Sequence, residues 1–428
     1  MNSFQPFYNR KIGVVDLSAS KAEVIPLVQK QVSRHIGGAA MNSAILEGYQ
    51  DDALVFGTGP LTGSFAPASS LMIASFASLV FNSICHVPFM LRTGPDMKFS
   101  GIDYLVVKGT APERSILHVN HGKIRTLPAG NLQHMHIPEA IRELKKASPL
   151  FQSVIITGPA ADRGIPFASV SIGTNGSLDK AGLASLMAAK NLKGIMLGGT
   201  EGLPFNRDNP QQGKELEKII STDKNFKHRG FYSVLKKLEG GEEAGKFLKA
   251  SGEKDMACYH CPSPCMTHVR YSWHDPRKKE MQNSKEGLLL LDHTGYAALA
   301  EKVGKNILPV LRACLHYGLD PAAVAEKLSE GGTMLEYLNA IDKIISDNPP
   351  QTTDVSQRQC LFGGGLPPIL TGDVLEKKVA IAMILGVCPI FLLRFAQITD
   401  ATLLSFISTS EEDLTTLQEG LSSAISSL

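Results

Sequence analysis

The sequence has few aromatic residues and no excess of charge of either sign. Aromatic residues make up 7% of the 428 residues, and 43 Lys and Arg residues stand against 41 Asp and Glu residues. The numbers of basic and acidic residues are nearly equal, whereas proteins that bind nucleic acid typically have an excess of basic residues. We therefore expect no nucleic-acid partner. With 20% charged and 43% hydrophobic residues, the composition is that of a globular protein. A chain of this length should form two or three domains with substantial cores.

Long apolar runs are also absent. No charged residue occurs between Asp52 and Arg92, but Gly and Pro residues interrupt this stretch. They do so before it reaches the ~20 continuous apolar residues that a membrane-spanning helix needs. Buried strands joined by tight turns are the better interpretation. The N-terminus has no basic segment followed by an apolar one, so we expect no signal peptide, no membrane span and a cytoplasmic protein.

Cysteine is scarce, and its seven residues are an odd number, which disfavours a framework of disulfides. Three of them lie in the segment Cys258-Tyr-His-Cys261-Pro-Ser-Pro-Cys265, and Cys388 follows far downstream. Three close thiolates and a remote fourth are the ligand pattern of an iron–sulfur cluster. The two prolines disfavour a helix in this segment, which leaves its thiols free to turn inward.

Two other interpretations of the thiols stay open from spacing alone. Cys258, Cys261 and Cys265 with His268 would make a Cys₃His zinc site. The three thiols could also be ordinary buried residues, since free Cys is common in protein cores. Cys360 is a lesser rival to Cys388 as the fourth cluster ligand.

The composition and hydrophobic periodicity of the chain change after about residue 202. The first part is rich in β-branched and small residues, and the second shows mostly helical periodicity. We therefore predict an α+β multidomain fold, with a β-rich N-terminal domain over residues 1–205 and mostly helical domains over residues 206–428. Strands are expected at 12–17, 53–56, 71–74, 104–107, 116–119 and 154–157, with a hairpin turn at 120–122. Helices are expected at 138–146, 180–193, 211–221, 231–238, 242–250, 296–317, 321–329, 332–346, 376–385 and 411–427.

Beyond the thiols, several segments resemble the tungsten-containing aldehyde ferredoxin oxidoreductase family. The segments Leu54–Gly63, Gly94–Gly109 and Gly182–Lys193 are similar to family segments, and they occur in the same order as the thiol loop and Cys388. The resemblance covers most of residues 10–400. It identifies the chain as a shortened, divergent member of the family.

The resemblance implies both a fold and an activity. A β-rich base domain would lie under a bis-pyranopterin cofactor with tungsten or molybdenum, and helical domains would hold a [4Fe-4S] cluster. An aldehyde or related carbonyl compound would be oxidised to the acid, with electrons leaving through the cluster to ferredoxin or another redox protein. Cys258, Cys261, Cys265 and Cys388 match the family's cluster ligands.

The positions that match the family's pterin contacts are only partly kept. The family motif D-x-x-G-L-(D/C) occurs twice, and here Gly318, Asp320 and Gly386 remain while apolar residues replace both leading Asp residues. Lys180 stands where the family has an Arg, just before Gly182, and it loses the bidentate geometry of a guanidinium. Loss of these polar partners would leave cofactor charge unpaired. The alternative function is therefore a family member without pterin, acting as an iron–sulfur electron-transfer or structural subunit.

Asp292 and His293 fall near the position of the family's catalytic Glu. They are candidates for a general base and a proton shuttle beside the cofactor. The alternative is that Asp292 caps the following helix by accepting backbone N–H bonds. We expect an oxidoreductase on these grounds, and self-association of the chain stays open.

Overall fold

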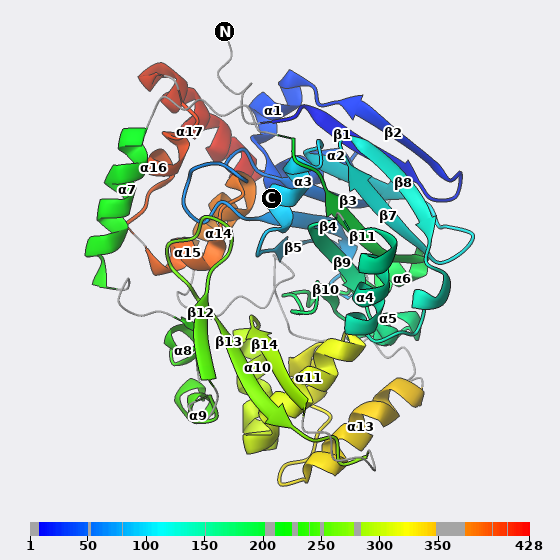
Figure 1. Cartoon of the computed structure of the whole chain (residues 1–428). Helices are drawn as coiled ribbons and strands as arrows, with labels where there is room; N and C mark the ends of the chain where they lie inside the picture. The colour runs from blue at the N-terminus through cyan, green and yellow to red at the C-terminus, as the bar shows by residue number, and fades with distance from the viewer. Residues whose placement is uncertain are drawn as a thin grey trace.

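The computed structural model describes residues 8–49, 53–78, 80–149, 151–201, 210–224, 230–238, 240–248, 252–277, 284–347, 373–395, 397–408 and 410–428. Two sheets occupy the first 200 residues, and helices predominate after them (Figure 1). The predicted α+β class, with a β-rich part followed by a mostly helical part, is confirmed. The expected domain boundary near residue 205 and the rival ligand Cys360 lie outside the described residues. Among the described helices, none has the length and apolar character needed to cross a membrane.

The first sheet has six strands in the order β2-β1-β6-β3-β4-β5. β1 and β6 pair in parallel, and the other neighbours are antiparallel. The uncharged stretch after Asp52 supplies three of the strands, which are largely buried, as the sequence predicted. The strands are β1 (Lys11–Asp16), β2 (Lys21–Pro26), β3 (Leu54–Thr58), β4 (Met72–Ser78), β5 (Ser83–Phe89) and β6 (Tyr104–Lys108).

The second sheet has five strands in the order β10-β9-β11-β7-β8. The predicted hairpin turn is confirmed, with Asn120 paired to Lys123 and with φ of +47° at His121 and +67° at Gly122. Two successive positive φ values are those of a type I′ turn, whose twist suits a hairpin. The strands are β7 (Ser115–Asn120), β8 (Lys123–Pro128), β9 (Ser153–Thr157), β10 (Val170–Ile172) and β11 (Leu192–Gly198).

The helix expected at 180–193 is shorter in the structure. α6 begins at Leu183 and ends at Ala189, because Asn191 adopts a φ of +55° and β11 starts at Leu192. The helical elements of the first part are α1 (Gln29–His35), α2 (Gly38–Leu46), α3 (Thr93–Phe99), η2 (Gly130–Leu132), α4 (Ile137–Ala147), α5 (Pro159–Asp162) and α6 (Leu183–Ala189).

The second part contains a small antiparallel sheet that the sequence did not predict. Its strands are β12 (Gly252–Met256), β13 (Met266–Trp273) and β14 (Ser284–Leu290), in that order. The helix expected at 296–317 is split at Gly304. The helical elements are α7 (Pro210–Thr222), α8 (Gly230–Leu235), α9 (Gly241–Lys246), α10 (His293–Val303), η4 (Gly304–Asn306), α11 (Ile307–Tyr317), α12 (Pro321–Ala325), α13 (Met334–Ser346), α14 (Asp373–Leu385), α15 (Pro389–Arg394), α16 (Asp400–Leu404) and α17 (Glu411–Ser426).

One hydrophobic core joins the two parts of the chain around the thiols. It contains Leu61 and Ala66 from the loop after β3, together with apolar residues of α14, α15 and α17. Cys258, Cys265 and Cys388 belong to the same core. In Figure 1 the loop after β3, drawn in blue, lies beside the orange helices α14 and α15 and above the green thiol loop. The fold therefore brings the two cysteine segments together against the N-terminal part.

Candidate functional site

The thiol loop connects β12 to β13 and turns its cysteines inward. Cys258 and Cys265 are each 8% exposed, Cys388 is 3% exposed, and Cys261 is half-buried. All the described cysteines are free thiols. Cys388 comes directly before α15, where Pro389 occupies the first helical position, which suits its fixed φ.

Hydrogen bonds hold the two cysteine segments to two N-terminal loops. The Cys388 N–H donates to the Ala68 carbonyl at 2.9 Å, and the Ala68 N–H donates to the His260 carbonyl at 2.9 Å. The Leu91 N–H donates to the Cys258 sulfur at 3.3 Å, and the Tyr259 N–H donates to the Leu91 carbonyl at 2.8 Å. The thiols are thus positioned by segments that lie far apart in the sequence.

The four thiols lie close enough to influence one another electrostatically. Burial raises the pKa of Cys265 well above its ordinary value, and the neighbouring Cys388, Cys258 and Cys261 raise it further. Burial, with a contribution from Cys258, raises the pKa of Cys388 to about 12. Burial disfavours the thiolate, so binding of a cationic metal centre would be needed to keep these groups ionised.

One buried cation lies next to the thiol loop. Arg394 at the end of α15 is 4% exposed, and its Nη1 donates to the Pro264 carbonyl at 3.3 Å. Burial raises the pKa of Cys261 and Cys265, and the positive charge of Arg394 opposes part of this effect by favouring the thiolates. An anionic cluster with four thiolate ligands would be stabilised by this guanidinium.

A single zinc ion and an iron–sulfur cluster make different demands on the spacing of the thiols. A zinc ion draws every ligand sulfur to about 2.3 Å from one point. Within the described residues, no three His, Cys, Asp or Glu side chains converge closely enough to hold one ion. His268, the fourth ligand of the zinc interpretation, lies on β13 with its ring against Gly287 of β14. In a cluster each thiolate binds a different iron, so the ligands stand farther apart.

His293 supports the thiol loop from the side of α10. Its Nε2 lies 3.0 Å from the Cys265 carbonyl, and its ring stacks on Phe231 with centroids 4.2 Å apart. Burial lowers the pKa of His293 to about 4, so the ring is neutral at pH 7. Nε2 can then donate to the carbonyl while Nδ1 stays unprotonated. This geometry makes His293 a support for Cys265, and its predicted role as a proton shuttle stays a prediction.

Three of the predicted site residues meet in a buried ion triad. The Lys180 ammonium contacts the Asp292 carboxylate at 2.7 Å and also contacts Asp320. Burial alone would lower the pKa of Lys180, but the two carboxylates outweigh it and raise the pKa. Asp292 also accepts the Gly295 N–H at 3.0 Å, so the expected helix cap is confirmed. Asp320 likewise caps α12 through the Ala322 N–H.

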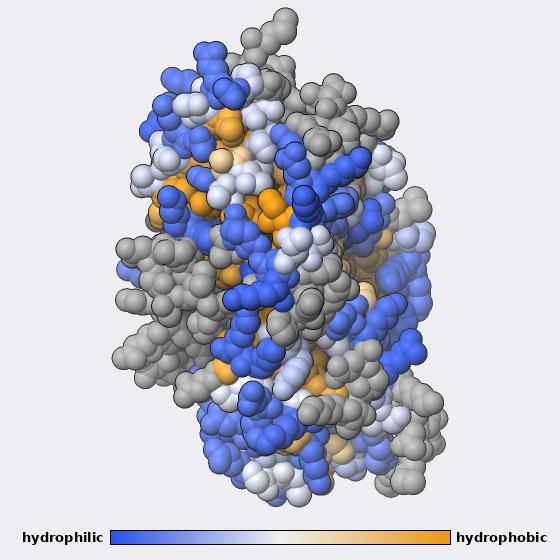
Figure 2. Space-filling view, turned by 90° about the vertical axis from the view of Figure 1, so that its left-hand side faces the viewer, coloured by the Kyte–Doolittle hydropathy of each residue, from blue (hydrophilic) through white to orange (hydrophobic). Residues whose placement is uncertain are grey.

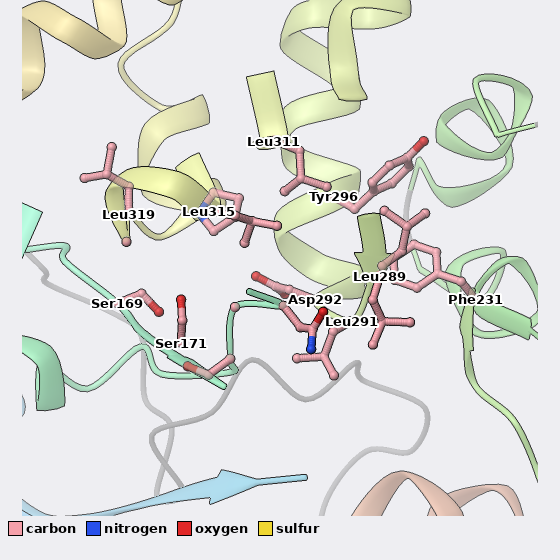
Figure 3. Close-up of a pocket in the computed structure, with 16 residues that line it drawn as sticks. Ser169, Ser171, Phe231, Leu289, Leu291, Asp292, Tyr296, Leu311, Leu315 and Leu319 are labelled. Atoms are coloured by element: carbon pink, nitrogen blue, oxygen red, sulfur yellow. The ribbon is translucent and has the colours of Figure 1, made fainter. Parts of the chain in front are cut away.

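A narrow pocket opens beside this triad. Figure 3 shows Leu311, Leu315 and Leu319 on one side of the pocket and Ser169 and Ser171 on the other. Asp292 also lines it, and no Lys, Arg or His is among the described residues of the lining. The pocket therefore offers apolar contacts, hydroxyl groups and one carboxylate.

Two of the three predicted glycines, Gly318 and Gly386, mark close contacts between the two parts of the chain. Gly318 ends α11 with a φ of +71°, and its carbonyl accepts the Ser169 N–H at 2.8 Å. Gly386 has a φ of +82°, and its carbonyl accepts the Leu71 N–H at 3.2 Å. Gly182 precedes α6 and lies against Val80, away from the other two.

The residues around the pocket do not fit the phosphate groups of a pterin cofactor. Such groups need Arg, Lys or clustered N–H donors. The triad of Lys180, Asp292 and Asp320 carries a net charge of −1 when all three are ionised, and the pocket lining adds no cation. The described lining therefore lacks the donors that bound pterin phosphates would need.

Some of the site was not predicted from the sequence. Arg394, Ala68 and Leu91 have no motif of their own, and only the folded chain places them at the thiols. The pairing of Lys180 with Asp292 and Asp320 crosses more than a hundred residues of sequence. No local sequence pattern predicts such a contact, although each of the three residues was expected individually to belong to the site.

Comparisons with known proteins agree with this architecture. Residues 12–199 match the family model described as aldehyde ferredoxin oxidoreductase, N-terminal domain. The tungsten-containing aldehyde ferredoxin oxidoreductase of Pyrococcus furiosus is 23% identical over 334 residues, which are 70% of this chain and 53% of that protein. The protein of the same name from Pyrococcus horikoshii is 27% identical over 241 residues, which are 50% of this chain and 40% of that protein. The chain thus spans about half the length of the curated relatives it matches.

A solved structure shares the fold. It is the active site complex BamBC of benzoyl coenzyme A reductase in complex with 1,5-dienoyl-CoA, with a TM-score of 0.65. The similarity covers 80% of this chain and 60% of that chain. At 18% sequence identity, it shows a common fold and nothing about the reaction.

Proposed function

Because the chain is a divergent member of the tungsten-containing aldehyde ferredoxin oxidoreductase family, we propose that it holds a [4Fe-4S] cluster and transfers electrons within an oxidoreductase system. The ligands are Cys258, Cys261, Cys265 and Cys388. The observation that carries the proposal is the meeting of two remote cysteine segments at one N-terminal loop, through the bonds of Ala68. Four thiols, three from one segment and one from the other, are the donor set that such a cluster requires.

The residues around the thiols would stabilise the bound cluster and its charge. The cluster itself supplies one-electron transfer when it is bound. The Leu91 N–H stabilises the Cys258 sulfur, and Arg394 offsets negative charge near Cys261 and Cys265. The apolar core around the thiols excludes water, which raises the strength of these electrostatic contacts. Hydrogen bonds and burial of this kind are the means by which proteins set a cluster's reduction potential.

Metal analysis of anaerobically purified protein tests the proposal. We expect about four irons and four sulfides per chain and a brown protein with broad visible absorbance. Replacing Cys388→Ser should abolish most of the iron and the absorbance, because a ligand is lost. Cys314→Ala is the matched control, since Cys314 is a fully buried free thiol outside the site, and it should keep both. Full iron content in Cys388→Ser would contradict the choice of the fourth ligand.

Oxidation of an aldehyde at a tungsten or molybdenum pterin is the second candidate function. The names of the matched relatives favour it, since they are tungsten-containing aldehyde ferredoxin oxidoreductases. In this candidate Lys180, Gly182, Gly318, Asp320 and Gly386 would contact the cofactor, and Asp292 with His293 would serve acid–base chemistry.

The same metal analysis separates the two candidates. About one tungsten or molybdenum per chain, together with four irons, supports the second candidate. Four irons without either metal, in a host that makes the pterin cofactor, support electron transfer alone. One zinc per chain without iron would contradict both.

A further inference from the structure

We propose that a monocarboxylate with an apolar body binds in the cavity between α5 and α6, with Arg114 holding its carboxylate. This cavity is called the α5–α6 cavity below. It lies in the β-rich part of the chain, and in Figure 1 α5 and α6 are on the opposite side from the thiol loop between β12 and β13. The inference goes beyond the proposed function, because no group of the cavity takes part in binding the cluster.

The α5–α6 cavity has the size and the wall of a small-molecule site. Its volume is about 410 Å³, and sites for small organic ligands typically measure about 300–1,000 Å³. Much of its wall consists of Ala and Gly residues in and beside the two helices, and Phe76, Val80 and Leu186 add larger apolar side chains. Among the described lining residues, Arg114 and Asp162 are the charged ones. An apolar wall with a few fixed polar groups is the usual construction of a ligand pocket.

Two buried cations share the Asp162 carboxylate. Its Oδ1 contacts Arg114 Nη2, and its Oδ2 accepts a hydrogen bond from Lys193 Nζ at 2.6 Å and another from the His134 N–H at 3.0 Å. The side chains of Asp162 and Lys193 are fully buried, and that of Arg114 is 9% exposed. When Arg114, Asp162 and Lys193 are all ionised, this Arg114 group has a net charge of +1. Buried charge is stabilised when it is paired, so a further anion would stabilise the Arg114 group.

The guanidinium of Arg114 has a donor that the rest of the protein leaves unused. Nη1 donates to the Ala188 carbonyl at 2.8 Å and Nη2 contacts Asp162, but the buried Nε has no hydrogen-bond partner among the described residues. A guanidinium keeps its charge at any physiological pH, and its planar fork matches a carboxylate. Since Arg114 lines the cavity, we place the carboxylate of the ligand beside it.

A second carboxylate would also offset the repulsion between the two cations. Burial lowers the pKa of Lys193, the charge of Asp162 opposes this effect, and the charge of Arg114 adds to it. A ligand with one negative charge suits the single excess positive charge. Inorganic phosphate suits it less well, because a second negative charge would face Asp162 and the apolar wall would stay uncovered.

The Arg114 group is separate from the ion triad of Lys180. Arg114 bonds to Ala188 near the end of α6, whereas Lys180 precedes this helix in the sequence. Lys180 pairs with Asp292 and Asp320, and none of these three is among the described residues that line the α5–α6 cavity. The proposed ligand therefore binds a cation that does not belong to the sites described above.

Titration calorimetry with hexanoate tests the inference, and hexanamide is the neutral ligand of nearly the same shape. We expect hexanoate to bind saturably with a dissociation constant of about 1 mM or lower. Hexanamide should bind at least about tenfold more weakly, because it lacks the charge-assisted hydrogen bond to Arg114. Inorganic phosphate should also bind more weakly than hexanoate. The amide is needed because the surface exposes apolar side chains among hydrophilic ones, as on the face shown in Figure 2, and these would bind the acid and the amide alike.

Two variants change the charge and the space of the cavity separately. Arg114→Gln removes the charge and leaves Asp162 paired with Lys193, so it should weaken hexanoate binding at least about tenfold and abolish the preference over hexanamide. Ser185→Phe adds a ring at a half-buried position of α6 that lines the cavity, so it should weaken hexanoate binding by filling the space. Arg142→Gln is the matched control, because it removes an exposed charge of α4 outside the described lining. The melting temperature of each variant is recorded first, so that only folded protein is titrated.

Several outcomes would overturn the inference. Equal affinity for hexanoate and hexanamide would contradict recognition of the charge, and so would equal hexanoate binding by Arg114→Gln and Arg142→Gln. Unchanged hexanoate binding in Ser185→Phe would contradict the α5–α6 cavity as the place of binding. Absence of saturable binding in the unaltered protein would contradict the site altogether.

The iron content of the same preparation separates this inference from the proposed function. About four irons per chain without hexanoate binding would contradict the carboxylate site alone. Hexanoate binding by protein that assembles no cluster would contradict the proposed function alone.

Discussion

The Lys180 ammonium is buried and paired with two buried carboxylates. It is 6% exposed and contacts two carboxylates that are 9% and 7% exposed. Replacing Lys180→Met would remove the cation that the buried carboxylates of Asp292 and Asp320 share. Loss of one partner of a buried ion pair typically costs about 3–5 kcal/mol of unfolding free energy. Chemical denaturation should detect a loss of this size, whereas Lys343→Met on the exposed surface should change it by less than about 0.5 kcal/mol.

The same variant should change how stability depends on pH. In the unaltered protein, burial acts to raise the pKa of Asp292, but Lys180 and the cap bonds outweigh it and lower the pKa. The ionised Asp292 therefore stabilises the fold above the unfolded pKa of about 3.9, and this contribution is lost as the pH falls through the lower folded value.

Without Lys180, burial would raise the folded pKa of Asp292 above its unfolded value. Protonation would then relieve the uncompensated charge. The penalty of Lys180→Met should therefore shrink as the pH is lowered from 8 to 5, measured by denaturant unfolding at both values. A penalty that is constant or grows toward pH 5 would contradict the assigned charge pairing.

Single residues could be singled out from the sequence where chemistry restricts the choice. The spacing of the thiols alone indicated Cys258, Cys261 and Cys265. Asp is a preferred helix-capping residue, and Asp292 caps α10 in the structure. Arg394 was not predicted as part of the site, because a lone Arg near the end of an apolar helix has no local pattern that distinguishes it. Its place beside Pro264 depends on packing between segments far apart in the sequence.

At the scale of elements, the turn between α14 and α15 fixes the position of Cys388. Gly386 adopts a φ of +82°, and a Cβ there would overlap the Thr62 hydroxyl and lie 3.0 Å from the Gly59 backbone. Gly386→Ala should lower the unfolding free energy by about 3 kcal/mol or more, since left-handed strain of about 1–2 kcal/mol adds to the steric overlap. It should also reduce iron content, because Cys388 follows two residues later.

Gly164 provides a matched control for this prediction. It has a similar φ of +69°, but a Cβ there would meet nothing within 4 Å. Gly164→Ala should therefore show the backbone strain alone, about 1–2 kcal/mol, with full iron content. Equal losses of stability in the two variants would contradict the tight contact between Gly386 and the loop after β3. Thermal denaturation and iron analysis of both proteins measure the difference.

The elements themselves were predictable to different degrees. The hairpin at Asn120-His-Gly carries its own turn signal, so β7 and β8 followed from local sequence. β12 reads Gly-Glu-Lys-Asp-Met, and these residues mostly have low strand propensity. Its conformation is decided by pairing with β13 in the register Gly252 to Arg270. Non-local pairing of this kind has no signature in the strand that depends on it.

At the scale of the whole molecule, a bound cluster would link two distant segments of the mostly helical part. Its ligands come from the β12–β13 loop and from the start of α15, and both contact the N-terminal loop around Ala68. A ligand that binds only the folded state stabilises it, so removing the cluster should lower the melting temperature by several degrees. Calorimetry before and after treatment with an oxidant and a chelator measures the shift. Cys388→Ser should show no further decrease on the same treatment.

The position of Cys388 also orders events during synthesis of the protein. Chains grow at about 5–20 residues per second, so Cys388 leaves the ribosome on the order of ten seconds after Cys265. Until then a nascent chain offers only three of the proposed ligands, and their neighbour α15 has not yet emerged. Assembly of the proposed four-ligand cluster would therefore have to wait until Cys388 and α15 have emerged.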